Sequence, residues 1–444
     1  MTQIMKKANT LTLEEKLMQS LVPDVEQPYR IPENWCWTYL TKGFAECKDG
    51  YRKPINATER ADRMGDIPYY GATGQVGWID DFLTNEELVL LGEDGAPFLD
   101  LLKDKAYLIS GKAWVNNHAH ILKSFFGHIG NLYLLNYLNV FNFTGYVNGT
   151  TRLKLTQSSM VTIPVPVSPL AEQQRIVDRI ESLFAKLDEA KEKAQAVVDG
   201  FEDRRAAILH KAFTGELTAE WRKENGYGIQ SWEDTILSKV LDVRDGTHDS
   251  PQYYDEGFPL VTSKNLKNGK ITDKDLKLIS KEDYEKINER SKVEVGDILF
   301  AMIGTIGNPV VVEEEPGFAI KNVALFKNTG EINPYYVRYY LESKTVIDKM
   351  EREAKGSTQR FVALGYLRSF PIKKPPEPEQ RLIVKLVDRL LGAEIQAKEA
   401  AEQVVDQIDA IKKSILARAF RGELGTNDPT DESAVELLKK TFII

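Results

Sequence analysis

Two histidines separated by one residue, His118 and His120, are the clearest candidate for metal chemistry in this sequence. On a strand they would lie on the same face, because successive side chains alternate. A zinc site needs a third and usually a fourth ligand. The chain offers only 5 histidines in all and 2 distant cysteines, Cys36 and Cys47. No further ligand is evident, so we predict no metal site.

The motifs of phosphate and methyl-transfer chemistry are incomplete. No GxxxxGK[ST] loop is present, so we expect this chain not to hydrolyse ATP. Asn333-Pro334-Tyr335-Tyr336 approaches the Asn-Pro-Pro-Tyr signature of amino-methyltransferases, but it lacks the second proline and no FxGxG cofactor motif precedes it. Glu353-Ala354-Lys355 imitates the end of a nuclease motif, yet a bare ExK is frequent in helices. We therefore expect no catalysis and no bound cofactor.

The remaining polar segments are suited to contacting nucleic acid. The loops 149–152 and 356–360 each combine glycine, hydroxyls and an arginine, which can donate to phosphate oxygens, although either loop could be a plain polar turn. Asn116 and Asn117 could bond an adenine edge. Tyr70 could stack on a base or belong to the core. The candidate DNA-binding residues are Tyr70, Thr73, Asn116, Asn117, His118, His120, Thr150, Thr151, Arg152, Lys154, Thr247, His248, Lys264, Asn265, Lys321, Ser357, Thr358, Gln359 and Arg360.

Charge and composition narrow the class of protein. The formal net charge of −8 argues against coating of nucleic acid along the whole chain. Residues 338–374 nevertheless hold nine Lys/Arg against four Asp/Glu, and residues 264–277 hold five against two. Such basic patches favour docking at one surface, although they also occur on ordinary solvated faces. No apolar run approaches the roughly 20 residues that span a bilayer. We expect a cytoplasmic protein without membrane contact.

An internal repeat sets the organisation of the chain. Between Glu172 and Leu217, 19 of 46 residues are identical to those 207 positions later, without a gap. Each half opens with a tryptophan-bearing segment, IPENWCWTYL or IQSWEDTIL. The predicted parts are an N-terminal extension (1–30), a first domain (31–168), a central conserved helix (169–217), a second domain (218–374), a C-terminal conserved helix (375–425) and a tail (426–444).

Periodicity predicts the secondary structure of these parts. Within each conserved segment, apolar residues recur at alternating steps of 4 and 3, which is typical of a coiled-coil seam. This seam comprises Ile176, Ile180, Leu183, Leu187, Ala190, Ala194, Val197 and Phe201, and the same frame recurs over 383–415. The two domains mix strand-like runs such as EELVLL and VALF with glycine-rich turns, so we predict an α/β (mixed α+β) fold. The stretch 333–350 is expected to be one helix capped by Asn333.

In combination, these motifs resemble the specificity subunits of type I restriction–modification enzymes over nearly the whole chain. The resemblance rests on IPENW, YYGATGQVGWID, GEDGA, WVNNHAHIL, DGTHDSP, GDILFAMIGTIG, IPVPVSPLAEQQRIV and FPIKKPPEPEQRLIV. It implies two target-recognition domains that each read one half of a bipartite double-stranded DNA site, separated by two long antiparallel helices in a pseudo-twofold repeat. It also implies two modification subunits that methylate adenine from S-adenosylmethionine, and restriction subunits that use ATP and Mg²⁺.

An antiparallel arrangement of the helices predicts their register. Arg204 and Glu394 are the charged residues in the two seams, and each has an apolar counterpart 207 positions away. Placing Arg204 opposite Glu394 also brings Leu187 opposite Ile411 and Ala190 opposite Ile408, seam to seam. We therefore expect an Arg204–Glu394 contact that fixes register more than it adds stability, against the alternative that both side chains extend outward independently.

Overall fold

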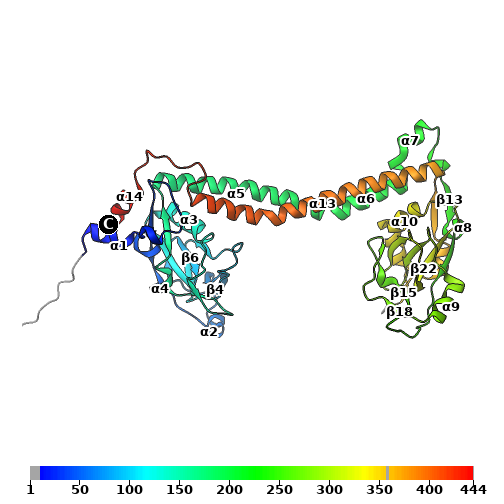
Figure 1. Cartoon of the computed structure of the whole chain (residues 1–444), viewed down its shortest axis with the longest axis horizontal. Helices are drawn as coiled ribbons and strands as arrows, with labels where there is room; N and C mark the ends of the chain where they lie inside the picture. The colour runs from blue at the N-terminus through cyan, green and yellow to red at the C-terminus, as the bar shows by residue number, and fades with distance from the viewer. Residues whose placement is uncertain (1–10, 357–359, 444) are drawn as a thin grey trace, which may run out of the picture. The chain divides into compact units, whose positions relative to one another are not determined.

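A computed structural model describes residues 11–356 and 360–443 and divides into two compact units. Unit 1 holds the residues up to Ala194 together with those from Gln403 onward, and unit 2 is Gln195–Glu402. Both units are mixed α/β, as the sequence predicts (Figure 1). Among the described residues, no helix is both long and apolar enough to cross a membrane.

Two four-stranded sheets form the body of unit 1. Its strands are β1 (Cys36–Tyr39), β2 (Ala45–Cys47), β3 (Ile67–Gly71), β4 (Gly74–Ile79), β5 (Thr84–Asn85), β6 (Leu88–Gly92), β7 (Ala106–Ile109), β8 (Lys112–Val115), β9 (Ala119–Ser124), β10 (Val147–Asn148), β11 (Lys154–Leu155) and β12 (Pro164–Val167). One sheet, in the order β2-β9-β6-β7, is antiparallel throughout. The other, β4-β3-β8-β5, contains the parallel pair β3–β8. A separate antiparallel pair, β1–β12, brings the beginning and end of the domain together.

Unit 2 repeats this topology with a different sequence. Its strands are β13 (Glu233–Ile236), β14 (Leu241–Asp245), β15 (Phe258–Thr262), β16 (Leu266–Lys267), β17 (Lys270–Ile271), β18 (Lys277–Ile279), β19 (Ile298–Ala301), β20 (Gly307–Val311), β21 (Ala319–Lys321), β22 (Val323–Asn328) and β23 (Pro371–Lys374). The sheet β14-β22-β19-β20 is antiparallel, and β18-β15-β21 contains the parallel pair β15–β21. The pair β13–β23 corresponds to β1–β12.

Short helices complete both units. They are α1 (Leu13–Ser20), α2 (Ala57–Asp62), α3 (Gly127–Leu138), α4 (Gln157–Met160) and α14 (Ala434–Thr441) in unit 1, and α7 (Ala219–Glu224), α8 (Leu237–Val240), α9 (Lys281–Ser291), α10 (Pro334–Glu342), α11 (Lys344–Glu353) and α12 (Leu364–Arg368) in unit 2. Asn333 caps α10 as predicted, because its side chain accepts from the Tyr335 amide. The single helix expected over 333–350 is wrong, since Ser343 adopts an extended conformation and separates α10 from α11.

The two conserved segments form long helices: α5 (Leu170–Asp199), α6 (Phe201–Thr214) and α13 (Glu377–Ala419). In unit 1, α5 and α13 are antiparallel, because Lys191 pairs with Asp409 at 3.2 Å while Lys412 pairs with Asp188 at 2.5 Å. The helix expected over 169–217 is interrupted at Gly200. There the Arg204 guanidinium donates to the carbonyl of Val197 at 2.7 Å.

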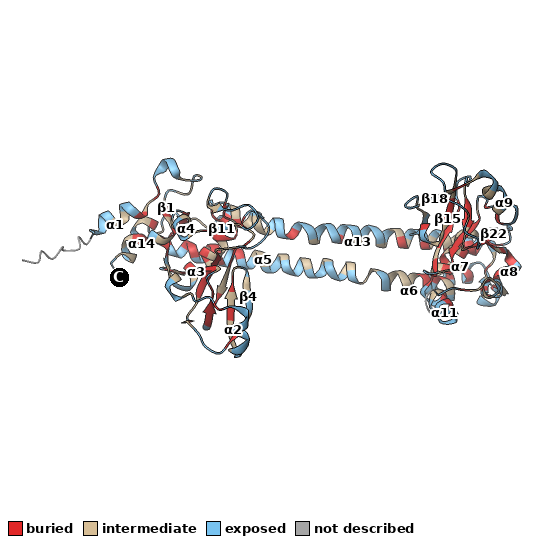
Figure 2. Cartoon of the chain, turned by 90° about the horizontal axis from the view of Figure 1, so that it is seen from below, coloured by how far each residue is buried: buried red, intermediate tan, exposed pale blue. Residues whose placement is uncertain are grey.

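The helix seam is less buried than its periodicity predicts. On α13, Ala401 and Ile408 are 8% and 2% exposed, but Val404 and Ile411 are each 42% exposed. On α5, Ala190 is exposed as well. Two paired helices cover only the line between them, so the flanking seam positions stay in contact with solvent (Figure 2). Ala190 and Ile411 are therefore seam positions that the helix pair leaves open to solvent.

Each domain core is completed by both long helices. In unit 1, Ile176 and Ile180 of α5 pack in the same cluster as Leu416 of α13 and Phe420, which directly follows α13. In unit 2, Leu209 of α6 packs with residues of α13 such as Ile383 and Val387. The beginning of one helix and the end of the other thus share one hydrophobic core with the sheets.

A buried glutamate near the start of each long helix binds a tryptophan. The Trp35 indole N–H donates to Glu172 at 2.6 Å, and the Trp232 indole N–H donates to the equivalent Glu379 at 2.9 Å. Both glutamates are fully buried. They differ in charge environment, because Glu379 is paired with the buried Arg222, whereas the side-chain donors to Glu172 are neutral groups of Trp35, Thr426 and Asn427.

The extension and the tail fold against the first domain. α1 lies beside α14 (Figure 1), and Ala434 and Leu438 join the hydrophobic core of unit 1. The Arg175 guanidinium binds both the carbonyl of Thr426 and the carboxylate of Asp431. The segment after α13 thereby closes onto the start of α5.

Candidate nucleic-acid interface

The loop 149–152 lies beside an acidic turn of unit 1. Gly149 has φ +111°, and a Cβ there would lie 2.4 Å from the Arg152 carbonyl oxygen, so only glycine fits. The Arg152 Nε lies 2.6 Å from Asp94 Oδ1. The Lys154 Nζ lies 3.1 Å from Glu93 Oε1. The candidates Thr150, Thr151 and Arg152 are exposed on this loop, and Lys154 is exposed on the following strand, β11.

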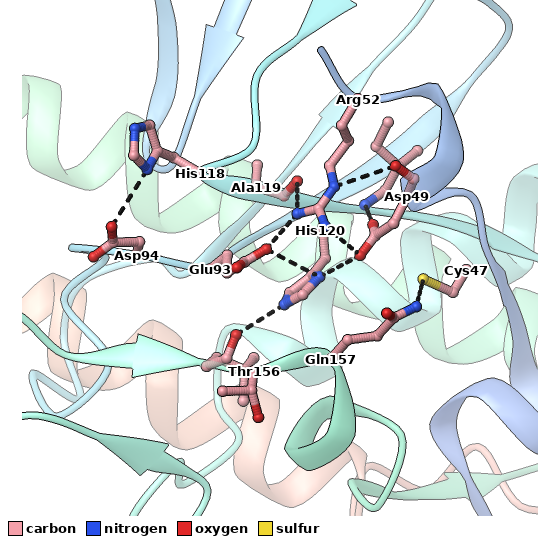
Figure 3. Close-up of polar contacts among 12 residues, drawn as sticks. Cys47, Asp49, Arg52, Glu93, Asp94, His118, Ala119, His120, Thr156 and Gln157 are labelled. Carbon is pink, nitrogen blue, oxygen red and sulfur yellow. Dashed lines mark hydrogen bonds and ion pairs between the residues drawn. The ribbon is translucent and has the colours of Figure 1, made fainter. Parts of the chain in front are cut away.

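The segment after β8 places a second group of candidates near the same turn. His118 Nδ1 lies 3.4 Å from Asp94 Oδ2 (Figure 3). Asp94 therefore brings His118 and Arg152 together. Asn117 is exposed, whereas Asn116 is 7% exposed and its Oδ1 accepts from the His118 amide at 2.8 Å. Asn116 thus shapes the turn that presents its neighbours.

His120 is a structural residue, which corrects its assignment as a base contact. It is fully buried in β9. Its Nδ1 lies 2.7 Å from Asp49 Oδ2, and its Nε2 lies 2.9 Å from the Leu155 carbonyl oxygen (Figure 3). Both ring nitrogens are occupied, so no ring atom is free to meet a base.

This histidine belongs to a compact charged cluster. Its two ring nitrogens face the Asp49 carboxylate and the Leu155 carbonyl, both of which are hydrogen-bond acceptors. Burial alone would raise the pKa of Asp49, but the hydrogen bond and charge of His120 prevail and lower it. Asp49, Glu93 and His120 offer ligand atoms within 4.8 Å of one another. Arg52 lies 2.9 Å from Asp49, and Lys154 pairs with Glu93. Both carboxylates therefore already have a cationic partner, and we interpret the cluster as an ion-pair network.

The aromatic candidate Tyr70 is half-buried against Tyr107, with ring centroids 5.9 Å apart. The Tyr70 carbonyl accepts from the Asn116 amide. Its neighbour Tyr69 is 1% exposed and bonds Ile55. Thr73 is exposed in the turn between β3 and β4. Tyr70 therefore contributes to a core cluster, while Thr73 remains accessible.

In unit 2, three candidates meet at one turn. Thr247 forms a bridge with Lys321, and His248 lies 2.9 Å from Asp245. Lys264 is exposed. The next residue, Asn265, is only 3% exposed. The side-chain Nδ2 of Asn265 donates to the carbonyls of Thr272 and Lys274, and its Oδ1 accepts from the Thr262 hydroxyl. Asn265 is therefore corrected to a structural residue.

The basic loop 356–360 is described only at its ends. Ser357, Thr358 and Gln359 lie outside the described residues. The Arg360 carbonyl accepts from the Gly304 amide at 2.9 Å, and its exposed guanidinium donates to the Glu351 carbonyl. This anchors the end of the loop to the glycine-rich turn after β19.

Sequence reasoning missed Asp245 and Arg290, which pair with each other. A signal was available, since Asp-Gly occurs in KDGYR and in RDGTH. Asp49 follows β2 and Asp245 ends β14, and these strands occupy the same edge of corresponding sheets. The shared position marks a common structural turn rather than a chance dipeptide.

Two domains of one topology, each joined to antiparallel helices and each bearing exposed polar loops, define a modular recognition protein. A family model described as type I restriction modification DNA specificity domain matches the chain twice, over residues 32–198 and 230–406. These matches cover most of the chain, so the chain belongs to that family. Its role is that of a DNA specificity subunit.

Individual relatives agree with this membership. The chain is 28% identical over 355 residues to S.HindORF215P of Haemophilus influenzae, described as a type I restriction enzyme specificity subunit, covering 76% of this chain and 83% of that protein. It is 26% identical to the EcoBI specificity subunit of Escherichia coli, covering 68% and 66%. The solved HsdS subunit from Thermoanaerobacter tengcongensis has the same fold, with a TM-score of 0.61 and 17% identity over 90% of this chain and all of that one.

Proposed function

We propose that each domain reads one half of a bipartite double-stranded DNA site, and that the helices hold the unread spacer and bind two modification subunits. The observation that carries this proposal is one topology used twice with unlike loop sequences. The antiparallel sheets of unit 1 and unit 2 have the same strand order, and each unit has a second sheet with one parallel pair, whereas the long gap-free repeat lies in the helical segments. Two copies of one helix sequence suit two copies of one partner, and unlike loops suit different half-sites.

The chemistry then belongs to the partner subunits. The modification subunits would supply adenine methylation from S-adenosylmethionine, and restriction subunits would supply ATP- and Mg²⁺-dependent cleavage in the cytoplasm. This chain would direct those reactions to one sequence. The exposed or half-buried residues that would contact DNA are Asn117, His118, Thr150, Thr151, Arg152 and Lys154 in unit 1, and Thr247, His248, Lys264, Lys321 and Arg360 in unit 2. Phosphate contacts would set position and base contacts would set sequence.

Methylation-sensitive sequencing tests this function. A host expressing this chain with its cognate modification subunit should carry one methylated-adenine motif with two defined halves and an unread spacer. A host expressing the modification subunit alone should lack the motif. Methylation with a continuous, undivided motif would contradict the division of labour between the domains.

A further inference from the structure

Five aromatic side chains line a cavity in unit 1. They are Tyr29, Tyr137, Phe141, Tyr146 and Phe420, and the cavity has a volume of about 370 Å³. Sites for small molecules usually measure about 300–1,000 Å³. The walls come from three parts of the chain that are far apart in the sequence: the N-terminal extension, the segment around the end of α3, and the residues around the end of α13. The cavity is therefore built by the tertiary fold of unit 1.

The rings are inclined to one another. The centroids of Tyr137 and Phe420 are 5.2 Å apart with an interplanar angle of 73°, and those of Phe141 and Tyr146 are 5.1 Å apart at 66°. Tyr137 and Phe420 are 2% and 1% exposed, so they belong to the rigid core. Walls of this kind present both ring faces and ring edges, and a planar aromatic ring between them pairs favourably with either.

An arginine without a partner in the chain also lines the cavity. The exposed Arg421 guanidinium lies over the Tyr29 ring, 5.4 Å from its centroid. Within the described part of the chain, it meets no carboxylate and no hydrogen-bond acceptor. Arg418, one helical turn earlier, is instead paired with Glu423 at 3.9 Å. The five N–H donors of Arg421 therefore remain available to a group from outside the chain.

Two tyrosine hydroxyls are available in the same way. Tyr137 donates to the Pro164 carbonyl, whereas the hydroxyls of Tyr29 and Tyr146 have no hydrogen-bond partner among the residues that the structure describes. Burial raises the pKa of both Tyr29 and Tyr146, so both hydroxyls stay protonated and act as neutral donors. Tyr29 is also held in place, because its carbonyl accepts from the Trp37 indole at 3.2 Å.

We propose that this cavity binds a small molecule in which a planar aromatic ring carries an anionic group. The ring lies between the tyrosine and phenylalanine side chains, and the anion binds Arg421. A guanidinium offers paired N–H donors that match a phosphate or a carboxylate, so either group fits. This inference goes beyond the proposed function and does not depend on it.

The second unit lacks the cation at the equivalent position. Phe213, which lies 207 residues before Phe420, packs on Tyr336 and Tyr340 with centroids 5.4 and 5.3 Å apart. The residue that corresponds to Arg421 is Thr214. A neutral hydroxyl does not attract an anion as a guanidinium does, so we expect one bound ligand per chain.

Calorimetric titration of the full chain, without DNA or partner subunits, tests the proposal. Adenosine 5′-monophosphate and indole-3-acetate are the two anionic probes, and adenosine and 3-methylindole are their uncharged analogues. At least one anionic probe should bind once per chain, about tenfold more tightly than its analogue. Binding of the monophosphate assigns the site to nucleotides, and binding of indole-3-acetate alone assigns it to aromatic carboxylates.

Three variants separate the anion from the ring. Arg421→Gln should lower the affinity for the anionic probe about tenfold and leave that for the uncharged analogue unchanged. Tyr146→Ala should weaken both by at least about fivefold, because a ring contact is lost. Arg418→Gln is the matched control, since Arg418 is 60% exposed near the same helix end but does not line the cavity. It should change neither affinity.

Hydrogen exchange gives a second measurement. A probe at about 100 times its dissociation constant should slow about 100-fold the amides that exchange by unfolding of unit 1, and leave unit 2 unchanged. The proposal is overturned if neither anionic probe binds, if Arg421→Gln binds the anionic probe as the native chain does, or if both units are protected equally. None of these results affects the proposed function, because methylation of a bipartite motif does not require this cavity.

Discussion

The Arg204 guanidinium lies 2.6 Å from the Glu394 carboxylate, and both residues occupy seam positions of the helix pair in unit 2. The two positions sum to 598, which is the register that the sequence predicts for the helix pair. Their side chains are 38% and 24% exposed. A contact so open to solvent selects one alignment of the helices while contributing little to their stability.

A double-mutant cycle should measure that contribution. Arg204→Ile and Glu394→Leu introduce the residues found 207 positions away, Ile411 and Leu187. We expect a coupling energy of about 0.2–1 kcal/mol in the unfolding of unit 2, because the pair is partly solvated. The more exposed pair Lys193–Glu189 in unit 1 provides a comparison with a coupling of about 0.3–0.5 kcal/mol. A coupling well above about 2 kcal/mol would contradict a role limited to register.

Gly200→Ala should stabilise the helix while weakening the Arg204–Glu394 contact that fixes the register. An added Cβ would lie 2.5 Å from Arg204 Nη1, the far end of a flexible side chain that can move. The backbone at Gly200 is already right-handed, so alanine should stabilise the helix by about 0.5–1 kcal/mol. The same change should weaken the Arg204–Glu394 coupling in a repeated cycle. Destabilisation by Gly200→Ala would show that the glycine is required for the interruption itself.

The buried glutamates should respond unequally to an amide. Glu172→Gln can keep its carbonyl oxygen toward Trp35 and Asn427 and turn its amide toward the Thr426 hydroxyl, so the cost should be about 1 kcal/mol. Glu379→Gln must lose either Arg222 or Trp232, leaving a buried cation or indole unpaired, and should cost about 3 kcal/mol. Hydrogen exchange resolved by unit measures both, because a two-unit chain has no single unfolding energy. Equal costs would contradict the assigned difference in charge environment.

The Asp49 cluster should make unit 1 sensitive to acid. The folded pKa of Asp49 lies below its ordinary value of 3.8, so the ionised carboxylate contributes stability above about pH 4, and that contribution is lost as pH falls through the folded value. Asp49→Asn should remove this part of the acid response and lower stability at neutral pH. Denaturation of the native chain and the variant from about pH 3 to about pH 7 checks it. If the stability of the native chain and of the variant changed with pH in the same way, Asp49 would not be the source of the acid response.

Exchange of the first domain should change half of the recognised sequence. Replacing residues 31–168 by the corresponding domain of another family member should alter one half of the methylated motif and leave the other half and the spacer intact. Methylome sequencing of a host carrying the chimera provides the readout. A simultaneous change in both halves would mean that the domains do not read DNA independently.

The sequence predicts this architecture well because the long helical segment occurs twice in the chain. An offset of 207 residues and charged seam positions are enough to place Arg204 near Glu394, since helix geometry is regular. The DNA-binding residues are harder to predict, because the tertiary fold decides which candidate side chains are buried. His118 and His120 look equivalent in the sequence, yet one borders solvent and the other is sealed between Asp49 and Leu155. Arg290 reaches Asp245 across 45 residues, a contact that no local pattern encodes.

The shared cores also dictate an order of completion during synthesis. Unit 2 ends at Glu402, so all of its residues have been made before the last part of unit 1 exists. The core of unit 1 needs Leu416 of α13, Phe420 directly after it and Leu438 of α14, all of which follow unit 2 in the sequence. Chains are made from the N-terminus at about 5–20 residues per second, so the domain that is translated first is the last one that can close. Until then the apolar residues that these segments will cover in unit 1 remain exposed to solvent.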